Sequence, residues 1–241
     1  MAPPTCAETA AASPLQSTPL SAPLRSAPLS VPLRRQAVTP LLKHLGRVEY
    51  EPTWRAMQRF TEERTEQTRD EIWFLEHPPV FTLGMNANRA HLLSPRDIPV
   101  IQIDRGGQVT FHGPGQLVVY PLIELKRAAL GVRDLVTALE RSVIALAAQL
   151  GISAHCRRGA PGIYVDERKL GSVGIRVRRG ASYHGLALNV SMDLEPFTRI
   201  NPCGYEGLQM TQLADLGGPA SVPEVAQLLE PHLLHALGFT A

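Results

Sequence analysis

The sequence has few cysteines and no long apolar run. Its three cysteines, Cys6, Cys156 and Cys203, lie far apart, and none belongs to a C-x-x-C pair. This spacing excludes a disulfide framework and is typical of a reducing compartment. His155 and Cys156 are adjacent and would face opposite sides of a strand, so we expect no metal site and no cofactor. No apolar stretch reaches the roughly 18 residues that a membrane helix needs. We therefore expect a cytoplasmic protein that has no membrane partner.

The net charge is also small, and lysines are few. The formal net charge is +2 over 241 residues, which argues against a general nucleic-acid-binding protein. Only three of the 24 basic residues are lysines, at Lys43, Lys126 and Lys169, so each lysine is a candidate for a specific role. Arginines gather at residues 157–158 and 176–179. They form either a solvated basic face or a surface that steers an acidic protein partner.

The first forty residues differ in composition from the rest of the chain. Leucine follows proline five times, with serine and alanine between the pairs. Regular proline excludes helices and sheet ladders, so residues 1–40 are expected to form a disordered tail. A transit peptide is the alternative, because the segment carries arginine, serine and a single acidic residue, Glu8. Residues 41–241 have the length of one domain with a full hydrophobic core.

Hydrophobic periodicity predicts both helices and strands in this domain. A spacing of three to four residues predicts a helix around residues 54–66, a long helix over 131–151 and a C-terminal helix over 222–237. Short apolar runs predict strands at residues 72–75, 80–83, 100–103, 117–120, 162–165, 170–177 and 183–190. This order predicts a mixed α/β or α+β fold whose largely antiparallel sheet is flanked by helices.

Glycine is densest at residues 104–116, which we call the Gly-rich stretch. It holds four glycines and one proline in thirteen residues. Such a cluster marks a sharp bend or a backbone that passes close to a ligand. A hairpin with solvated polar residues is the alternative. The glycines do not follow the dinucleotide-binding pattern, and no Gly-Lys-Ser/Thr closes a P-loop.

Cys203 is the candidate nucleophile. Pro202 and Gly204 flank it, so it should stand on a tight turn that a pocket can reach; a buried, inert cysteine is the alternative. A thiol attacks as the thiolate, which a nearby cation favours. Lys169 can be that cation, or a base when it is neutral; otherwise it is an exposed lysine at a hairpin.

Histidines supply rival bases for this cysteine. His112 and His184 are the two candidates, since Cys–His pairs are the more familiar arrangement. His77 and His91 are interpreted as structural residues, because a lone histidine usually forms only local hydrogen bonds. Sequence spacing alone does not choose between Lys169 and the two candidate histidines.

Four longer segments carry a resemblance to a known family. They are residues 76–84, 104–121, 169–174 together with 183–189, and 199–213. In these segments, and over about residues 42–238, the sequence resembles lipoyl(octanoyl) transferases, the octanoyl-[acyl-carrier-protein]:protein N-octanoyltransferases of the biotin/lipoate protein ligase superfamily. The resemblance implies the fold of those ligases, a mixed, largely antiparallel sheet with helices on its faces. Leu170-Gly171 stands where the family is expected to have Ile-Ala, a change that bears on pocket shape.

The resemblance also implies a chemistry. The family moves an octanoyl or lipoyl group, without ATP, from acyl carrier protein to a lysine of a lipoyl domain, the first step of endogenous protein lipoylation. Cys203 would carry the acyl-thioester, and Lys169 would lower the pKa of its thiol. The implied acceptors are lipoyl domains of 2-oxoacid dehydrogenase complexes and the glycine cleavage H protein. The implied acyl pocket is lined by Arg105, Gly106, Gly107, Gln108, Val109, Thr110, Phe111, His112, Ser172, Val173, Gly174, Gly185, Leu186 and Ala187.

Two other functions stay open at this point. An ATP-dependent lipoate or biotin protein ligase shares the implied fold and needs no nucleophilic cysteine. A non-catalytic protein that binds acyl groups or lipoyl domains would bind tightly without a covalent adduct. For the transferase, backbone N–H groups of the Gly-rich stretch or near Gly174 are the expected oxyanion donors.

Overall fold

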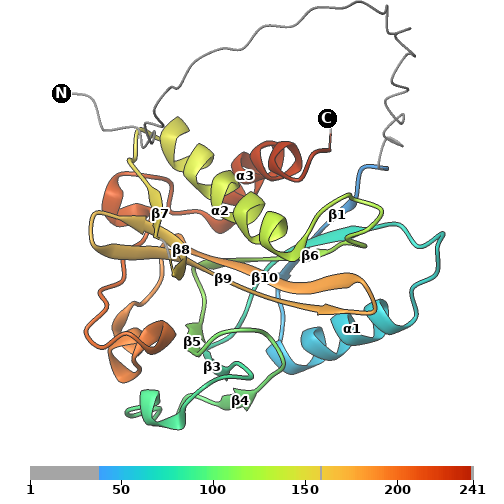
Figure 1. Cartoon of the computed structure of the whole chain (residues 1–241). Helices are drawn as coiled ribbons and strands as arrows, with labels where there is room; N and C mark the ends of the chain where they lie inside the picture. The colour runs from blue at the N-terminus through green and yellow to red at the C-terminus, as the bar shows by residue number, and fades with distance from the viewer. Residues whose placement is uncertain (1–37, 158, 240–241) are drawn as a thin grey trace, which may run out of the picture. The chain divides into compact units, whose positions relative to one another are not determined.

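The computed structural model describes residues 38–157 and 159–239, which form two β-sheets and three α-helices (Figure 1). The predicted tail lies outside the described residues as far as residue 37. None of the helices in the described part of the chain is long and apolar enough to cross a membrane.

The larger sheet has seven strands, and its order confirms the predicted antiparallel character. Only β1 and β2 pair in parallel, and the other neighbours pair antiparallel. The order is β1 (Leu41–Arg47), β2 (Glu71–Glu76), β6 (Gln116–Leu122), β10 (Ala181–Asn189), β9 (Arg168–Arg178), β8 (Ala160–Val165) and β7 (His155–Arg157).

The central strands of this sheet are buried on both faces. Ile72 and Phe74 of β2 pack with α2 (Val132–Gln149) and α3 (Val222–Ala236), whereas Trp73 and Leu75 pack with α1 (Tyr50–Glu62). Successive side chains of a strand point to opposite faces, so a sheet with helices on both sides requires apolar residues at every position. Figure 1 shows α2 and α3 together on one face.

A second, smaller sheet includes the middle of the Gly-rich stretch. Its three strands have the order β4 (Val100–Gln102), β3 (Val80–Leu83) and β5 (Val109–His112). The sequence predicted a sharp bend, a close approach to a ligand or a hairpin for this stretch and no strand over residues 109–112, which form β5. They pair antiparallel with β3, because the glycines lie on either side of the strand and leave its interior free to join the ladder.

The predicted helices are all present, but α1 is shifted by four residues and begins at Tyr50 instead of Trp54. α1 ends at Glu62, earlier than the predicted end near residue 66. Arg64 instead turns inward, where it donates to the carbonyl oxygen of Leu122 and pairs with the carboxylate of Asp70. These bonds hold Arg64 against β6 and against Asp70, the residue before β2. The chain therefore leaves the helical path after Glu62.

Candidate functional site

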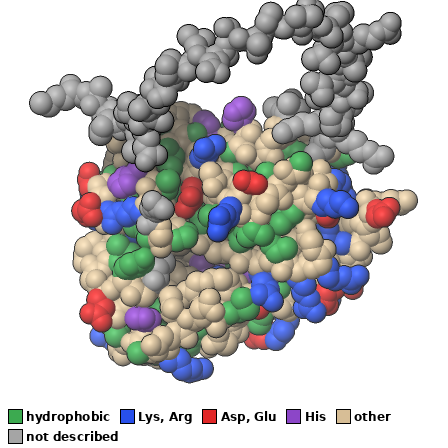
Figure 2. Space-filling view, viewed as in Figure 1, with side chains coloured by type: hydrophobic (Ala, Val, Ile, Leu, Met, Phe, Trp, Pro, Cys, Tyr) green, Lys and Arg blue, Asp and Glu red, His purple; other side chains and the backbone are tan. Residues whose placement is uncertain are grey.

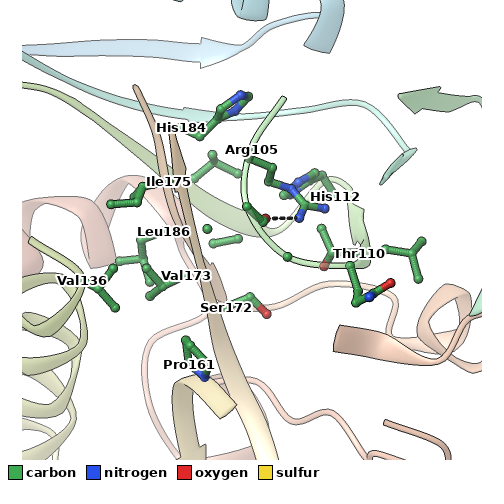
Figure 3. Close-up of a pocket in the computed structure, with 18 of the residues that line it drawn as sticks. Arg105, Thr110, His112, Val136, Pro161, Ser172, Val173, Ile175, His184 and Leu186 are labelled. Atoms are coloured by element: carbon green, nitrogen blue, oxygen red, sulfur yellow. Dashed lines mark hydrogen bonds between the residues drawn. The ribbon is translucent and has the colours of Figure 1, made fainter. Parts of the chain in front are cut away.

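A cavity of about 330 Å³ lies between the Gly-rich stretch and strands β9 and β10 (Figure 3). Its walls are mainly apolar, with side chains such as Val118, Val136, Val173, Ile175 and Leu186. Concave, mostly apolar sites with a few placed polar groups are typical of small-molecule binding. The cavity is therefore the candidate site for an apolar chain.

The structure brings thirteen of the fourteen predicted pocket residues to this cavity, and Phe111 is the exception. Along β5, Thr110 and His112 face the cavity, so Phe111 between them faces the other way. Its ring packs against Phe81 and Phe197, with centroids 5.4 and 5.5 Å apart. Phe111 thus belongs to the core of the smaller sheet and not to the cavity wall.

The glycines bring backbone against backbone around the cavity. A Cβ on Gly185 would lie 2.1 Å from the carbonyl oxygen of Val119, so β10 can approach β6 this closely only with glycine there. The amide of Gly106 donates to the carbonyl of Ile175 at 3.1 Å, which fixes the Gly-rich stretch on β9. The sequence predicted a close approach of the backbone to a ligand. The structure shows that these glycines let the backbone segments of the cavity wall approach one another.

Arg105 is buried and turned toward the protein. One end of its guanidinium, Nη1, donates to the carbonyl of Gly106 at 2.9 Å. The other end, Nη2, donates to the carbonyl and the hydroxyl of Thr82, at 2.9 and 3.0 Å. These bonds join the Gly-rich stretch to β3, so the arginine shapes the cavity wall through its fixed fork of donors.

Asp104 collects hydrogen bonds from two elements at one end of the cavity. From α1, Trp54 Nε1 donates at 2.8 Å and Gln58 Nε2 at 3.2 Å; from β10, the Tyr183 hydroxyl donates, and His184 Nε2 lies 3.0 Å away. Burial alone would raise the pKa of Asp104, but the bonds from His184 and Tyr183 hold it well below its usual range. The carboxylate therefore stays charged and ties α1 to β10.

The two candidate histidines, His112 and His184, both line the cavity. Burial lowers the pKa of each imidazole. Burial lowers the pKa of His112 to about 3, and its Nδ1 is bonded to Gln116 Oε1 at 2.7 Å. Burial also lowers the pKa of His184, more than Asp104 raises it. Both rings are thus neutral near pH 7. Their environment favours a role as rigid wall groups.

Lys169 is fully buried beside the opposite end of the cavity. It is the second residue of β9, and its Nζ donates to the carbonyl of Pro161 at 2.9 Å. Pro161 itself lines the cavity and lies far from His184 in Figure 3. This burial excludes the alternative of an exposed hairpin lysine. A lysine this deep is a candidate for chemistry, since burial is otherwise costly.

The backbone of Cys203 lies on a short 3-10 turn, Pro202–Gly204, which we call the cysteine turn. This agrees with the tight turn that its proline and glycine predict. Tyr205, which follows the turn, lines the cavity. Gly204 lies next to Gln108 of the cavity wall, because a Cβ at Gly204 would be 3.4 Å from Gln108 Cγ. The turn is therefore at the edge of the cavity.

The chain that follows the cysteine turn runs alongside Lys169. The Lys169 amide donates to the carbonyl of Gln209 at 2.9 Å, and the amide of Thr211 donates to the carbonyl of Lys169, also at 2.9 Å. Hydrogen bonds on both sides fix this segment on β9. The candidate lysine is thus held, beside one end of the cavity, against the chain that begins a few residues after the cysteine turn.

Sequence reasoning missed several wall residues. Tyr50 and Val136 come from α1 and α2, and no motif marks either of them. Their only signal in the sequence is an apolar position in a helix or strand, which core residues share. Within residues 38–157 and 159–239, no group of three or more His, Cys, Asp or Glu side chains is placed to hold a metal.

Two of the arginines in the groups noted from the sequence are paired with carboxylates. Arg157 pairs with Glu167 at 2.7 Å, and Arg178 pairs with Glu62 at 2.9 Å. On the face shown in Figure 2, basic and acidic side chains are interspersed. A mixed surface of this kind produces only a weak field for steering an acidic partner.

Comparison with known proteins gives one consistent result. The family described as lipoyl protein ligase A/B catalytic domain matches residues 49–234. An octanoyltransferase of Shewanella sp. (strain MR-7) is 55% identical over 204 residues, covering 85% of this chain and 94% of that protein. Lipoate-protein ligase A bound with ATP has a similar fold, with a TM-score of 0.69 and 15% identity over 83% of this chain and 86% of that one. A biotin protein ligase from Aquifex aeolicus gives a TM-score of 0.53 at 15% identity, over 82% and 70% of the two chains.

Proposed function

The chain belongs to the family of lipoyl protein ligase A/B catalytic domains, and we propose that it transfers octanoyl groups through a thioester on Cys203. It is an acyltransferase of protein lipoylation, and its general partners are acyl carriers and lipoyl domains. The finer assignments are ours. Octanoyl-acyl carrier protein is the donor, and the acceptors are lipoyl domains of 2-oxoacid dehydrogenase complexes and the glycine cleavage H protein. We place the enzyme in the cytoplasm, which suits its scattered cysteines.

The observation that supports this mechanism is the buried Lys169 at one end of an apolar cavity, where its backbone pairs with residues 209–211, the chain that follows the cysteine turn. With the acyl chain in the cavity, its thioester carbon comes to the cavity edge, where the thiolate of Cys203 can attack. The carrier thiolate then leaves and takes up a proton. Lys169 supplies a buried positive charge that favours the thiolate over the thiol.

The second half-reaction regenerates the enzyme. The neutral ε-amine of the acceptor lysine attacks the same carbonyl carbon, the nitrogen loses a proton, and the Cys203 thiolate leaves. A thioester is exchanged for a thioester and then converted into an amide, which is downhill. The two steps therefore balance without ATP.

The cavity suits a medium-length acyl chain. Its apolar side chains come from β6, α2, β9 and β10, and its volume of about 330 Å³ lies within the range of small-molecule sites. At the end away from Lys169, the walls come from Tyr50, Tyr120, His112 and His184. We propose that the chain runs from the cysteine turn toward this aromatic end.

The steady-state test separates this function from that of an ATP-dependent ligase, whose fold the chain shares. Purified protein is supplied with octanoyl-acyl carrier protein and a lipoyl domain, without ATP, and the octanoylated domain is measured. We expect turnover by the wild type and almost none by Cys203→Ser. Turnover that requires free octanoate and ATP, and that survives Cys203→Ser, would establish the ligase instead.

A further inference from the structure

The residues that lead into the cysteine turn are hydrogen-bonded to a segment for which no function has yet been described. This segment contains the 3-10 helix η1 (Arg89–His91). The amide of Asn201 donates to the carbonyl of His91 at 2.8 Å, and Leu92 forms an isolated bridge with Ile200. The main chain at His91 and Leu92 is thereby fixed against the residues that lead into Pro202–Gly204.

The His91 ring is oriented by the same contact. Asn201 Nδ2 lies 3.5 Å from His91 Nδ1, and an amide nitrogen can only donate, so Nδ1 is the acceptor of this long hydrogen bond. With Nδ1 accepting, the ring nitrogen left to donate is Nε2. That atom would lie 3.5 Å from a Cβ on Gly204, so the N–H faces the cysteine turn.

Two polar groups on the cavity side of the turn are already engaged. Gln108, on the cavity side, accepts from the amide of Asn88 at 2.9 Å and donates to the carbonyl of Asn86 at 2.7 Å. The amide of Gly106, one of the expected oxyanion donors, donates to Ile175. These bonds hold the wall in place and use the Gly106 amide, which is one of the donors expected from the Gly-rich stretch.

We propose that His91 Nε2–H donates a hydrogen bond to the substrate carbonyl oxygen as that oxygen becomes negative during attack by Cys203 and by the acceptor amine. This role rests on the proposed function, because it requires an acyl group on Cys203. His91 keeps its proton throughout. In each step the carbonyl double bond opens onto the oxygen and reforms as a thiolate leaves. Removing one such donor typically lowers kcat by about 10²–10³-fold.

The test compares two reactions of the same sulfur. Acyl transfer from octanoyl-acyl carrier protein passes through an oxyanion, whereas alkylation of Cys203 by iodoacetamide does not. For His91→Ala we expect formation of the acyl-enzyme to slow by about 100-fold, with the alkylation rate unchanged. His91→Gln keeps an N–H donor at a similar reach and should recover most of the loss.

Two further variants control for structure. His91→Phe retains a flat ring that fills the same space but has no N–H, so it should behave as His91→Ala does. His232→Ala removes an imidazole of α3 whose Nε2 lies 2.7 Å from Oε1 of Gln149 on α2. This variant should leave both reactions unchanged. Melting temperatures of all the variants verify that they are folded.

Several results would overturn the assignment. Parallel losses of acylation and alkylation would mean that His91 only positions the cysteine turn. A His91→Gln enzyme as slow as His91→Ala would exclude a hydrogen-bond donor role, as would normal acylation in His91→Phe. Failure of the wild type to form any acyl-enzyme would instead refute the proposed function, so the two failures are distinguishable.

Discussion

Asp104 is the polar residue on which the wall between α1 and β10 depends, and replacing it should be costly. In Asp104→Leu, three buried groups lose their acceptor, namely those of Trp54, Tyr183 and His184, whose residues are 8%, 0% and 1% exposed. Gln58 is more accessible and can turn to water. An unsatisfied buried donor costs about 1–3 kcal/mol, so the three together should destabilise the protein by roughly 3–9 kcal/mol. Domains have only about 5–15 kcal/mol of stability in total.

Asp104→Asn is the matched variant. Its Oδ1 still accepts from Trp54 and can accept from His184, so we expect a loss of about 1–3 kcal/mol for the single altered position. Urea unfolding at pH 7 measures both free energies of unfolding, with Trp54 as an intrinsic fluorophore beside the mutated side chain. A loss below about 1 kcal/mol for Asp104→Leu would mean that the network does not hold α1 on β10, and the reasoning would fail.

Three other predictions address the lysine, the buried histidines and the tail. Lys169→Ala should slow alkylation of Cys203 by iodoacetamide at neutral pH, because the buried positive charge is gone; unchanged kinetics would remove Lys169 from this role. Burial lowers the pKa of His112 to about 3 and that of His77 to about 4, so the unfolded chain protonates first, and stability should fall as the pH drops from about 6.5 toward 4. Urea midpoints across this range measure the effect, and His112→Asn, which can still donate to its glutamine partner, should flatten it. Deleting residues 1–37 should leave the turnover rate intact, and a large loss would assign the tail to the fold or to partner docking.

The sequence predicted best those elements that bury an apolar face. β3 has its predicted bounds, and α3 ends within one residue of its predicted end. β1 was missed because several of its side chains are exposed and because its parallel partner, β2, lies after α1 in the chain. β7 has only three residues, too few for a period to be recognised. β5 was not predicted because glycine and proline flank this four-residue strand.

The site was predictable where residues lie in contiguous motifs, and not where distant segments converge. The two segments around Lys169 and His184 both reach the cavity, as does the Gly-rich stretch. Phe111 packs away from the cavity, and a motif does not reveal which side chains of a strand point away from a pocket. His91 was interpreted as structural because its contact with the cysteine turn depends on pairing between segments more than a hundred residues apart.

Intact-protein mass spectrometry is the most direct test of the central claim, a thioester on Cys203. The wild type and Cys203→Ser are each mixed with octanoyl-acyl carrier protein, and their masses are compared before and after hydroxylamine. We predict a single octanoyl adduct on the wild type, released by hydroxylamine, and none on Cys203→Ser. An adduct that persists in Cys203→Ser, or no adduct on the wild type with a carrier shown to be loaded, would contradict the account.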